Sequence, residues 1–353
     1  MIKGTSLFSN VGIAETYLER NGIEISVANE LLENRSNFYR FLYPKTDVIT
    51  GDITREEIFD KVVNESVKNK IEFLIATPPC QGMSVAGKMN ENDKRNTLII
   101  KVIEFIKIVK PKNIIIENVP TMLKTSILVN GKKIKITDYI QNELGKDYKI
   151  SFNILNSADY GTAQVRKRAI VLLSKYYDWK LPEKQEQITV EDAIGWLPSI
   201  ESGEYSNIKY HYGSKHNEKH ILWMKHTPTG KTAFDNKIYF PKKEDGTRIK
   251  GFSTTYKRIS WDKPSPTITM CNGGISSQNN VHPGRKLPDG TYSDARVLSL
   301  KELMILTGLP NDWTIPSWAS ENLVRKVIGE GIPPKMIEAI IKNIPTDKGS
   351  GRI

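Results

Sequence analysis

Short apolar runs alternate with longer amphipathic segments through the first half of the chain, and this alternation restricts the fold more than any other feature. The runs TSLFS, IEISVANE, DVITGDI, IEFLIA and NIIIENV are typical of strands. Between them, TREEIFDKVVNESVKN and NTLIIKVIEFIKIVKP have the periodicity of helices. Strands that alternate with helices form a parallel sheet with helices on both faces. We therefore predict an α/β fold with a doubly wound sheet.

Local signals refine this prediction. Residues 12–22 are expected to be helical, and Thr54, with Glu57 three residues later, predicts the N-cap of the next helix. The runs YKISFNILNSADYG and KRAIVLLS predict a β-hairpin at the edge of the sheet. After about Tyr176 glycine, proline, lysine, histidine and aromatic residues become dense. We predict a larger domain of residues 1–178 plus 320–353 and a smaller, loop-rich domain of residues 179–319.

The charge of the chain is concentrated in one segment. The formal net charge is +11 over 353 residues. The segment from Tyr205 to Arg258 contains twelve Lys or Arg and four Asp or Glu, so its net charge is +8. Such an excess indicates either a polyanionic partner or a solvated basic face. The two cysteines argue against a disulfide framework, and no apolar run is long enough to span a bilayer. We expect a cytoplasmic protein with no membrane segment.

One cysteine stands where a strand has just ended. Cys80 follows Pro78 and Pro79 after the run IEFLIA, so the backbone before it is stiffened by two prolines. A nucleophile is presented in this way at the carboxyl end of a strand. Cys271, in TITMCNGG, is instead expected to be a packed small residue.

Charged residues near other strand ends supply partners for the thiol. Glu117 ends the next strand, and Arg166 with Arg168 occupy alternate positions at the start of a later one. A thiolate and a protonated carboxyl in one pocket suit attack on an electron-poor ring, with the acid protonating a ring nitrogen. The arginines favour the thiolate and can hold a carbonyl oxygen.

The first three strand ends suggest a nucleoside cofactor. Ser9, Asn10 and Gly12 follow the first strand, where backbone N–H groups can meet a ligand. Glu30 and Asp52 end the next two strands, positions suited to ribose hydroxyls and an adenine amine. Each acid alone is more often a solvated cap. Because the G-x-G-x-x-G fingerprint is incomplete, an adenosine cofactor without a pyrophosphate is expected.

The blocks PPCQ, ENV and QVRKR, in this order, resemble conserved blocks of the cytosine-C5 DNA methyltransferases. So do SLFSNVGIAE, RISWDKPSPTIT, the pair HPGR and RVLSLKELMILTGLP, and GEGIPP. The resemblance runs from Ser6 to about Ile344 and leaves only residues 205–257 unmatched. It implies a Rossmann-like fold that binds S-adenosylmethionine, with a second, smaller domain.

The resemblance also implies a mechanism. Cys80 would attack C6 of a cytosine flipped out of duplex DNA, with Glu117 at N3 and Arg168 at O2, and C5 would take the methyl group. Arg166 is carried over with Arg168 as a catalytic residue. The C-terminal block would close the cofactor pocket. The implied cofactor-binding residues are Phe8, Asn10, Gly12, Ile13, Glu30, Asp52, Ile53, Pro79, Leu98, Glu330 and Gly331.

Three positions of the first block depart from the family pattern, because Ser6, Asn10 and Ile13 replace an aspartate and two glycines. Asparagine tolerates a left-handed backbone, whereas isoleucine does not. Cofactor affinity is the property that Ile13 is expected to affect. Glu330 replaces an asparagine in the last block and is expected to pair with the ammonium of the cofactor.

Residues 205–257 fall where this family carries its target-recognition region, which would assign the basic excess to DNA phosphates and base edges. The expected partner is double-stranded DNA, bound between the two domains by a monomeric enzyme associated with the nucleoid. A cognate restriction endonuclease would act independently. The expected DNA-binding residues are Gln81, Ser84, Lys225, Lys231 and Arg258.

Other interpretations stay open. Four histidines, at 211, 216, 220 and 226, suggest a metal site. Because no cysteines or acids stand at matching spacing, we predict no metal site. The aromatic residues of the basic segment, such as Trp223 and Phe234, suit a small core better than base stacking. An RNA cytosine-C5 methyltransferase and a non-catalytic DNA-binding regulator remain alternative functions.

Overall fold

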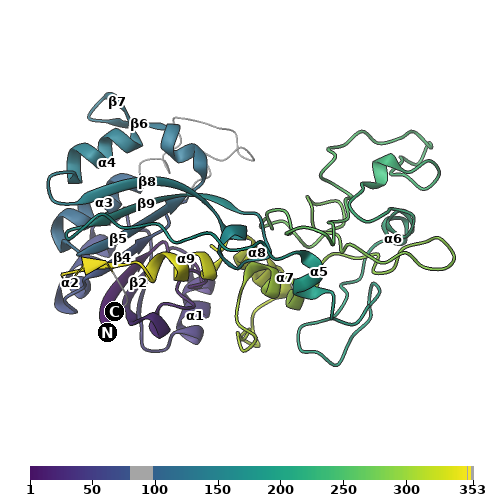
Figure 1. Cartoon of the computed structure of the whole chain (residues 1–353), viewed down its shortest axis with the longest axis horizontal. Helices are drawn as coiled ribbons and strands as arrows, with labels where there is room; N and C mark the ends of the chain where they lie inside the picture. The colour runs from purple at the N-terminus through teal and green to yellow at the C-terminus, as the bar shows by residue number, and fades with distance from the viewer. Residues whose placement is uncertain (80–97, 348, 351–353) are drawn as a thin grey trace. The chain divides into compact units, whose positions relative to one another are not determined.

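The computed structural model describes residues 1–79, 98–347 and 349–350 and divides into two compact units (Figure 1). Unit 1 comprises Met1–Asn156, Lys167–Lys184 and Met336–Ile353, and unit 2 comprises Ser157–Arg166 and Gln185–Lys335. Residues 320–335 therefore belong to unit 2, unlike the predicted boundary. Helix α8 (Glu321–Glu330) is held there because Arg325 donates to the carbonyl oxygen of Leu298 at 2.9 Å.

Unit 1 is built on a seven-stranded sheet with the order β3-β2-β1-β4-β5-β9-β8. The first five strands are parallel, β9 runs antiparallel to β5, and β8 pairs with β9 at the edge. The α/β fold and the edge hairpin are thus confirmed. The strands are β1 (Ile2–Leu7), β2 (Ile23–Glu30), β3 (Asp47–Thr50), β4 (Phe73–Ala76), β5 (Asn113–Asn118), β8 (Lys149–Asn156) and β9 (Lys167–Ser174).

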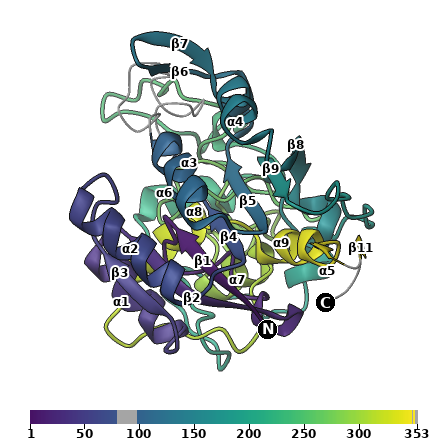
Figure 2. The ribbon, with the colours of Figure 1, turned by 90° about the vertical axis from the view of Figure 1, so that its left-hand side faces the viewer.

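Helices cover both faces of this sheet (Figure 2). One apolar cluster joins the strands to α2 (Glu56–Lys68), α3 (Leu98–Val109) and α4 (Ile136–Leu144). The buried side chains of α1 (Glu33–Leu42) and α9 (Pro334–Ile341) lie outside that cluster and cover the other face. The central strands β4 and β5 are buried along their whole length, as the unbroken apolar runs in their sequence require.

Two local predictions are wrong. Residues 12–22 form turns that end in a short 3₁₀ helix, Glu19–Asn21, because Gly12 has a φ of 81° and Thr16 bonds the carbonyl of Ile13. Thr54 does not cap α2, because the N–H and the hydroxyl of Thr54 both donate to Asp52. The N-cap of α2 is Arg55. These bonds draw Thr54 into the turn after β3.

A small antiparallel hairpin, β6 (Ser126–Val129) and β7 (Lys132–Lys135), stands between β5 and α4. It extends from one end of the sheet at the top of unit 1 in Figure 1. The 3₁₀ helix Pro120–Lys124 joins β5 to the hairpin. A short terminal ladder, β10 (Pro345–Thr346) and β11 (Gly349–Ser350), completes the unit.

Unit 2 is rich in loops, and its helices besides α8 are α5 (Val190–Ile194), α6 (Glu218–Lys225) and α7 (Leu300–Thr307). Its core contains Trp223, confirming that this aromatic residue of the basic segment packs inside. Phe234 and His220 each contact the ring of Tyr256 beside that core. Within the described ranges, no helix has the length and apolar character needed to cross a membrane.

Candidate active site

The loop that leads to Cys80 is held from two neighbouring strand ends. After β4, the hydroxyl of Thr77 donates to the carbonyl of Phe8 at 3.0 Å, and the side-chain amide of Asn118 donates to the carbonyl of Pro78 at 3.0 Å. Cys80 itself lies outside the described residues, as do Gln81 and Ser84. Asn118 was not predicted, although it directly follows Glu117 in the block ENV. Its amide fixes the backbone two residues before the cysteine.

Glu117 and Arg168 form a buried ion pair at the carboxyl end of β5. The guanidinium Nε of Arg168 lies 2.8 Å from the carboxylate Oε1 of Glu117. The side chain of Arg168 is 14% exposed and that of Glu117 is 9% exposed. The antiparallel register brings them together, because β9 begins beside the end of β5, where Ala169 faces Asn118. The structure thus brings together two of the candidate catalytic residues, although their pairing was not predicted. An arginine so placed fixes the orientation of the carboxyl group.

Arg166 does not join this pair, which corrects the prediction. Its guanidinium is buried in unit 2 and donates to the carbonyl oxygens of Ile268, Gly329 and Glu330 at 2.9–3.0 Å. Strand β9 begins only at Lys167, so the alternation that would align Arg166 with Arg168 does not reach it. Arg166 instead ties the end of α8 to the segment around Ile268.

The loop after β1 is bound to the end of β2 through Glu30. Its carboxylate accepts from the backbone N–H of Asn10 and from that of Leu32, each at 3.0 Å. Phe8, Asn10 and Gly12 all have positive φ, so the chain turns sharply after the strand. At Gly12 a Cβ would come within 2.3 Å of the Tyr43 ring, so no larger residue fits. The Tyr43 hydroxyl donates to the Gly12 carbonyl at 2.5 Å.

The other predicted cofactor positions divide into three groups. In unit 1, Asp52 and Pro79 are partly exposed after β3 and β4, and Leu98 is partly exposed at the start of α3. Ile13 and Ile53 are each only 2% exposed and count among the buried apolar residues of unit 1. Glu330 and Gly331 end α8 in unit 2. An acid at the end of β2 and another after β3, with the exposed Leu31 directly after the first acid, fit an adenosine group.

The family model for C-5 cytosine-specific DNA methylases matches residues 2–346. The chain belongs to this family. It is 54% identical to the type II methyltransferase M1.HgaI of Avibacterium volantium over 97% of this chain and 98% of that protein. It is 28% identical to M1.HphI of Haemophilus parahaemolyticus over 96% and 85% of the two chains.

Solved structures agree with the fold. A protein described as a DNA modification methyltransferase encoded within an E. coli prophage superposes with a TM-score of 0.69 at 19% identity, covering 97% of both chains. The Entamoeba histolytica methyltransferase EhMeth gives 0.65 at 15% identity with the same coverage. The protein is a DNA cytosine-5-methyltransferase with a Rossmann-like fold.

In this methyltransferase, the expected DNA-binding residues of unit 2 differ in exposure. Lys225 and Lys231 are exposed. Arg258 is fully buried, and its guanidinium donates to the carbonyl oxygens of Met224, His282 and Asp294. Its assignment to DNA binding is therefore wrong, because it holds three segments of unit 2 together.

Two other sequence expectations concern cysteine and histidine. Cys271 is exposed, so the expectation of a packed residue is wrong. His211 is buried between the Ser299 hydroxyl and the Pro198 carbonyl, and His226 stacks on Tyr239. Among the residues that the structure describes, no group of three His, Cys, Asp or Glu side chains could hold a metal ion.

The segment after β1 contains a buried acid that makes the stability of the enzyme depend on pH. Glu15 is 4% exposed and bonds to Ser6, and burial raises its pKa from 4.5 to about 7. The folded state therefore binds this proton more tightly than the unfolded state. The free energy of unfolding should therefore decrease as pH rises from about 4.5 to about 7. Above pH 7 the total decrease caused by Glu15 should be at most about 3 kcal/mol.

Glu15→Gln should remove this cost. We expect its melting temperature to exceed that of the native enzyme more at pH 8 than at pH 5, measured by thermal unfolding at both values. Glu19→Gln, on the same segment but exposed, is the matched control and should show no such pH-dependent gain. An equal effect of Glu15→Gln at both pH values would contradict the buried-proton explanation.

Proposed function

We propose that this enzyme transfers the methyl group of S-adenosylmethionine to C5 of a cytosine flipped out of a short specific sequence in double-stranded DNA. The observation that carries the proposal is the buried Glu117–Arg168 pair beside the strand end that leads to Cys80. Relatives named as type II methyltransferases support a role as the modification enzyme of a restriction–modification system. A restriction endonuclease would recognise the same sequence independently of this monomer.

Cytosine C5 is a poor nucleophile, and the proposed chemistry activates it. The Cys80 thiolate adds to C6, and the carboxyl group of Glu117 donates a proton to N3, which moves the electron pair to C5. C5 then takes the methyl group. Loss of the C5 proton to a base, departure of the Cys80 thiolate from C6 and return of the N3 proton to Glu117 restore the ring. Arg168 orients Glu117 and places a positive charge beside the O2 side of the base.

When bound, S-adenosylmethionine supplies an electrophilic methyl group. Glu30 would hold its ribose and Asp52 its adenine amine, at the two strand ends where the structure has these acids. Phe8, Pro79 and Leu98 would line the pocket in unit 1. By the family resemblance, we also assign Glu330 and Gly331 to cofactor binding.

Sequence recognition is assigned to unit 2. Its segment 205–257 carries most of the net positive charge, and Lys225 and Lys231 are exposed on it. We assign these lysines to phosphate contacts, which position the enzyme on the duplex without reading bases. Base edges would be read by other side chains of the same segment.

The role of Glu117 predicts a large loss of turnover on a small chemical change. Glu117→Gln keeps the shape of the side chain but cannot transfer a proton to N3, so kcat should fall by roughly 10²- to 10⁴-fold. Single-turnover methyl transfer measures this. Glu143→Gln is the matched control, because Glu143 forms an exposed ion pair with Lys107 on the helices. Its kcat should equal that of the native enzyme, and an equal kcat for Glu117→Gln would remove Glu117 from the mechanism.

The proposed function is tested by incubating the enzyme and S-adenosylmethionine with unmethylated duplex DNA and, in parallel, with tRNA. The products are digested to nucleosides and identified by mass spectrometry. We expect 5-methylcytosine in DNA alone. 5-Methylcytosine in tRNA alone would assign the enzyme to RNA, and no product despite DNA binding would indicate a regulator.

A further inference from the structure

The hairpin β6–β7 of unit 1 carries a second concentration of positive charge, distinct in sequence from the basic segment 205–257. Between Glu117 and Asp138 the chain has four lysines and no acidic residue. Lys124, Lys132, Lys133 and Lys135 are all exposed. A basic surface of this kind indicates a polyanionic partner.

The hairpin is rigid enough to hold these charges in place. Asn130 and Gly131 form its two-residue turn with φ values of 49° and 77°, the left-handed conformation that tight hairpins favour. At its base the N–H of Ile136 donates to the carbonyl of Thr125 at 3.0 Å. Ile127 and Ile134 face each other across the two strands and belong to or pack against the core of unit 1.

The register places lysines on the outer face. Because side chains alternate along a strand, Lys133 and Lys135 lie on the face opposite to Ile134. Leu128 pairs with Lys133 on that outer face and is 56% exposed. The outer face of the hairpin therefore presents Lys133 and Lys135 to solvent.

The position of the hairpin indicates which polyanion it meets. Only the short helix Pro120–Lys124 separates Glu117 from the hairpin, so both lie at the edge of the sheet where β1, β4 and β5 end. A duplex that brings its cytosine to Glu117 must also pass this edge.

We infer that the outer face of the hairpin binds the phosphates of duplex DNA beside the target cytosine. The inference rests on the proposed function, in that the ligand is the duplex that the enzyme modifies. Lysine–phosphate contacts are independent of base sequence, so they anchor unit 1 on DNA and do not select the site.

Salt dependence measures such contacts directly. The variant with Lys133 and Lys135 both changed to glutamine should reduce the magnitude of the slope of log affinity against log salt by about 1 to 2, since each neutralised phosphate contributes about 0.9. Binding to a labelled random-sequence duplex is the readout. It needs neither the target sequence nor activity. The charge-conserving variant, with the same lysines changed to arginine, should keep the native slope.

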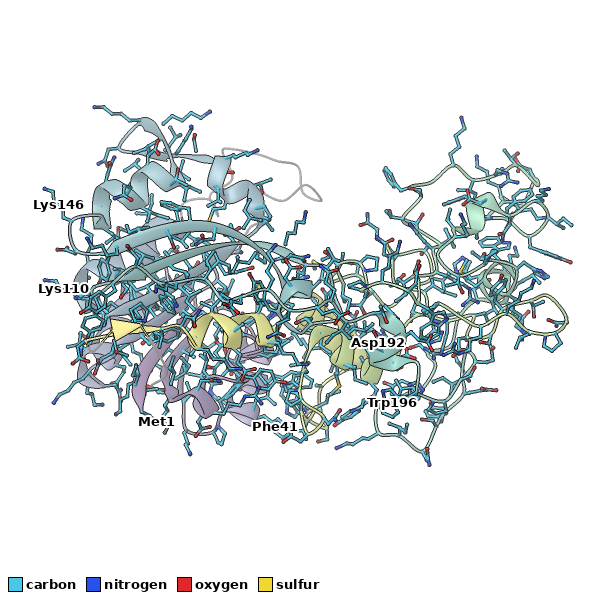
Figure 3. All side chains as sticks on the ribbon, viewed as in Figure 1. Met1, Phe41, Lys110, Lys146, Asp192 and Trp196 are labelled. Atoms are coloured by element: carbon cyan, nitrogen blue, oxygen red, sulfur yellow. The ribbon has the colours of Figure 1, made fainter. Side chains whose placement is uncertain are left out.

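The matched control changes two exposed lysines at the opposite ends of the strands, where β4 and β5 begin. Lys70 lies between α2 and β4, and Lys110, labelled in Figure 3, lies between α3 and β5. Their change to glutamine removes the same charge and should leave the slope unchanged. Equal slopes for the hairpin variant and the native enzyme, or an equal decrease in the control, would overturn the inference.

Failure of the inference and failure of the proposed function are distinguishable. A native enzyme that methylates DNA, with an unchanged slope in the hairpin variant, contradicts the hairpin contact alone. A slope of reduced magnitude in that variant with no 5-methylcytosine formed by the native enzyme supports the contact and contradicts the activity. Circular dichroism of each variant confirms that it is folded.

Discussion

Replacing Cys80 with alanine is expected to reduce methyl transfer to DNA by at least about 10⁴-fold, because no other group can form the bond to C6 that makes C5 nucleophilic. DNA binding should be retained, since the charges of both units are unchanged. The measurement is transfer of a labelled methyl group under single-turnover conditions, with DNA affinity determined on the same preparation.

The second cysteine supplies the control for this variant. Cys271 is exposed and lies in unit 2, so Cys271→Ala makes the same chemical change without touching the proposed nucleophile. It should methylate DNA at the native rate. Unchanged methylation by Cys80→Ala, or a comparable loss in Cys271→Ala, would contradict the assignment of Cys80.

Replacing Arg296 with methionine is expected to destabilise the enzyme by about 3 to 5 kcal/mol, because it leaves two buried carboxylates without their counter-charge. Arg296 is fully buried and bonds Asp294 at 2.8 Å and Glu302 at 2.8 and 2.9 Å. Burial raises the pKa of Glu302, but the charge of Arg296 and the other groups around this carboxyl together lower its pKa to about 2. Urea unfolding followed by tryptophan fluorescence measures the loss.

Arg285→Met is the matched control for this prediction. Arg285 also pairs with a glutamate in unit 2, at 2.8 Å from Glu191, but both side chains are about half exposed. Exposed pairs of this kind contribute about 0 to 1 kcal/mol, so the control should unfold close to the native midpoint. Equal midpoints for the two variants would show that the buried cluster does not stabilise unit 2.

The sheet and part of the site could be predicted from the sequence because they depend on local patterns. Unbroken apolar runs define β4 and β5, and parallel strands end at a common edge. That geometry is sufficient to place Glu117 beside the segment that precedes Cys80. The pairing of Glu117 with Arg168 follows once β9 is known to lie against β5.

The remaining features depend on contacts between distant segments. Arg258 looks like a DNA-binding residue within a basic run, and only the folded chain shows carbonyl groups from three other segments around it. The sequence pattern predicted that Arg166 belongs to the strand of Arg168, whereas β9 begins one residue later, at Lys167. The β6–β7 hairpin had a local signal, the Asn130–Gly131 pair, which the surrounding lysines obscured. Helix α1 was not predicted because its sequence is largely polar.

A duplex in which 5-fluorocytosine replaces cytosine tests the central claim most directly. Fluorine at C5 prevents the final proton loss, so methyl transfer should leave the enzyme bound covalently to C6 of the base. After incubation with S-adenosylmethionine, peptide mass analysis should locate the adduct on Cys80, and Cys80→Ala should form none. An adduct on another residue, or none with an enzyme that binds the duplex, would contradict the mechanism.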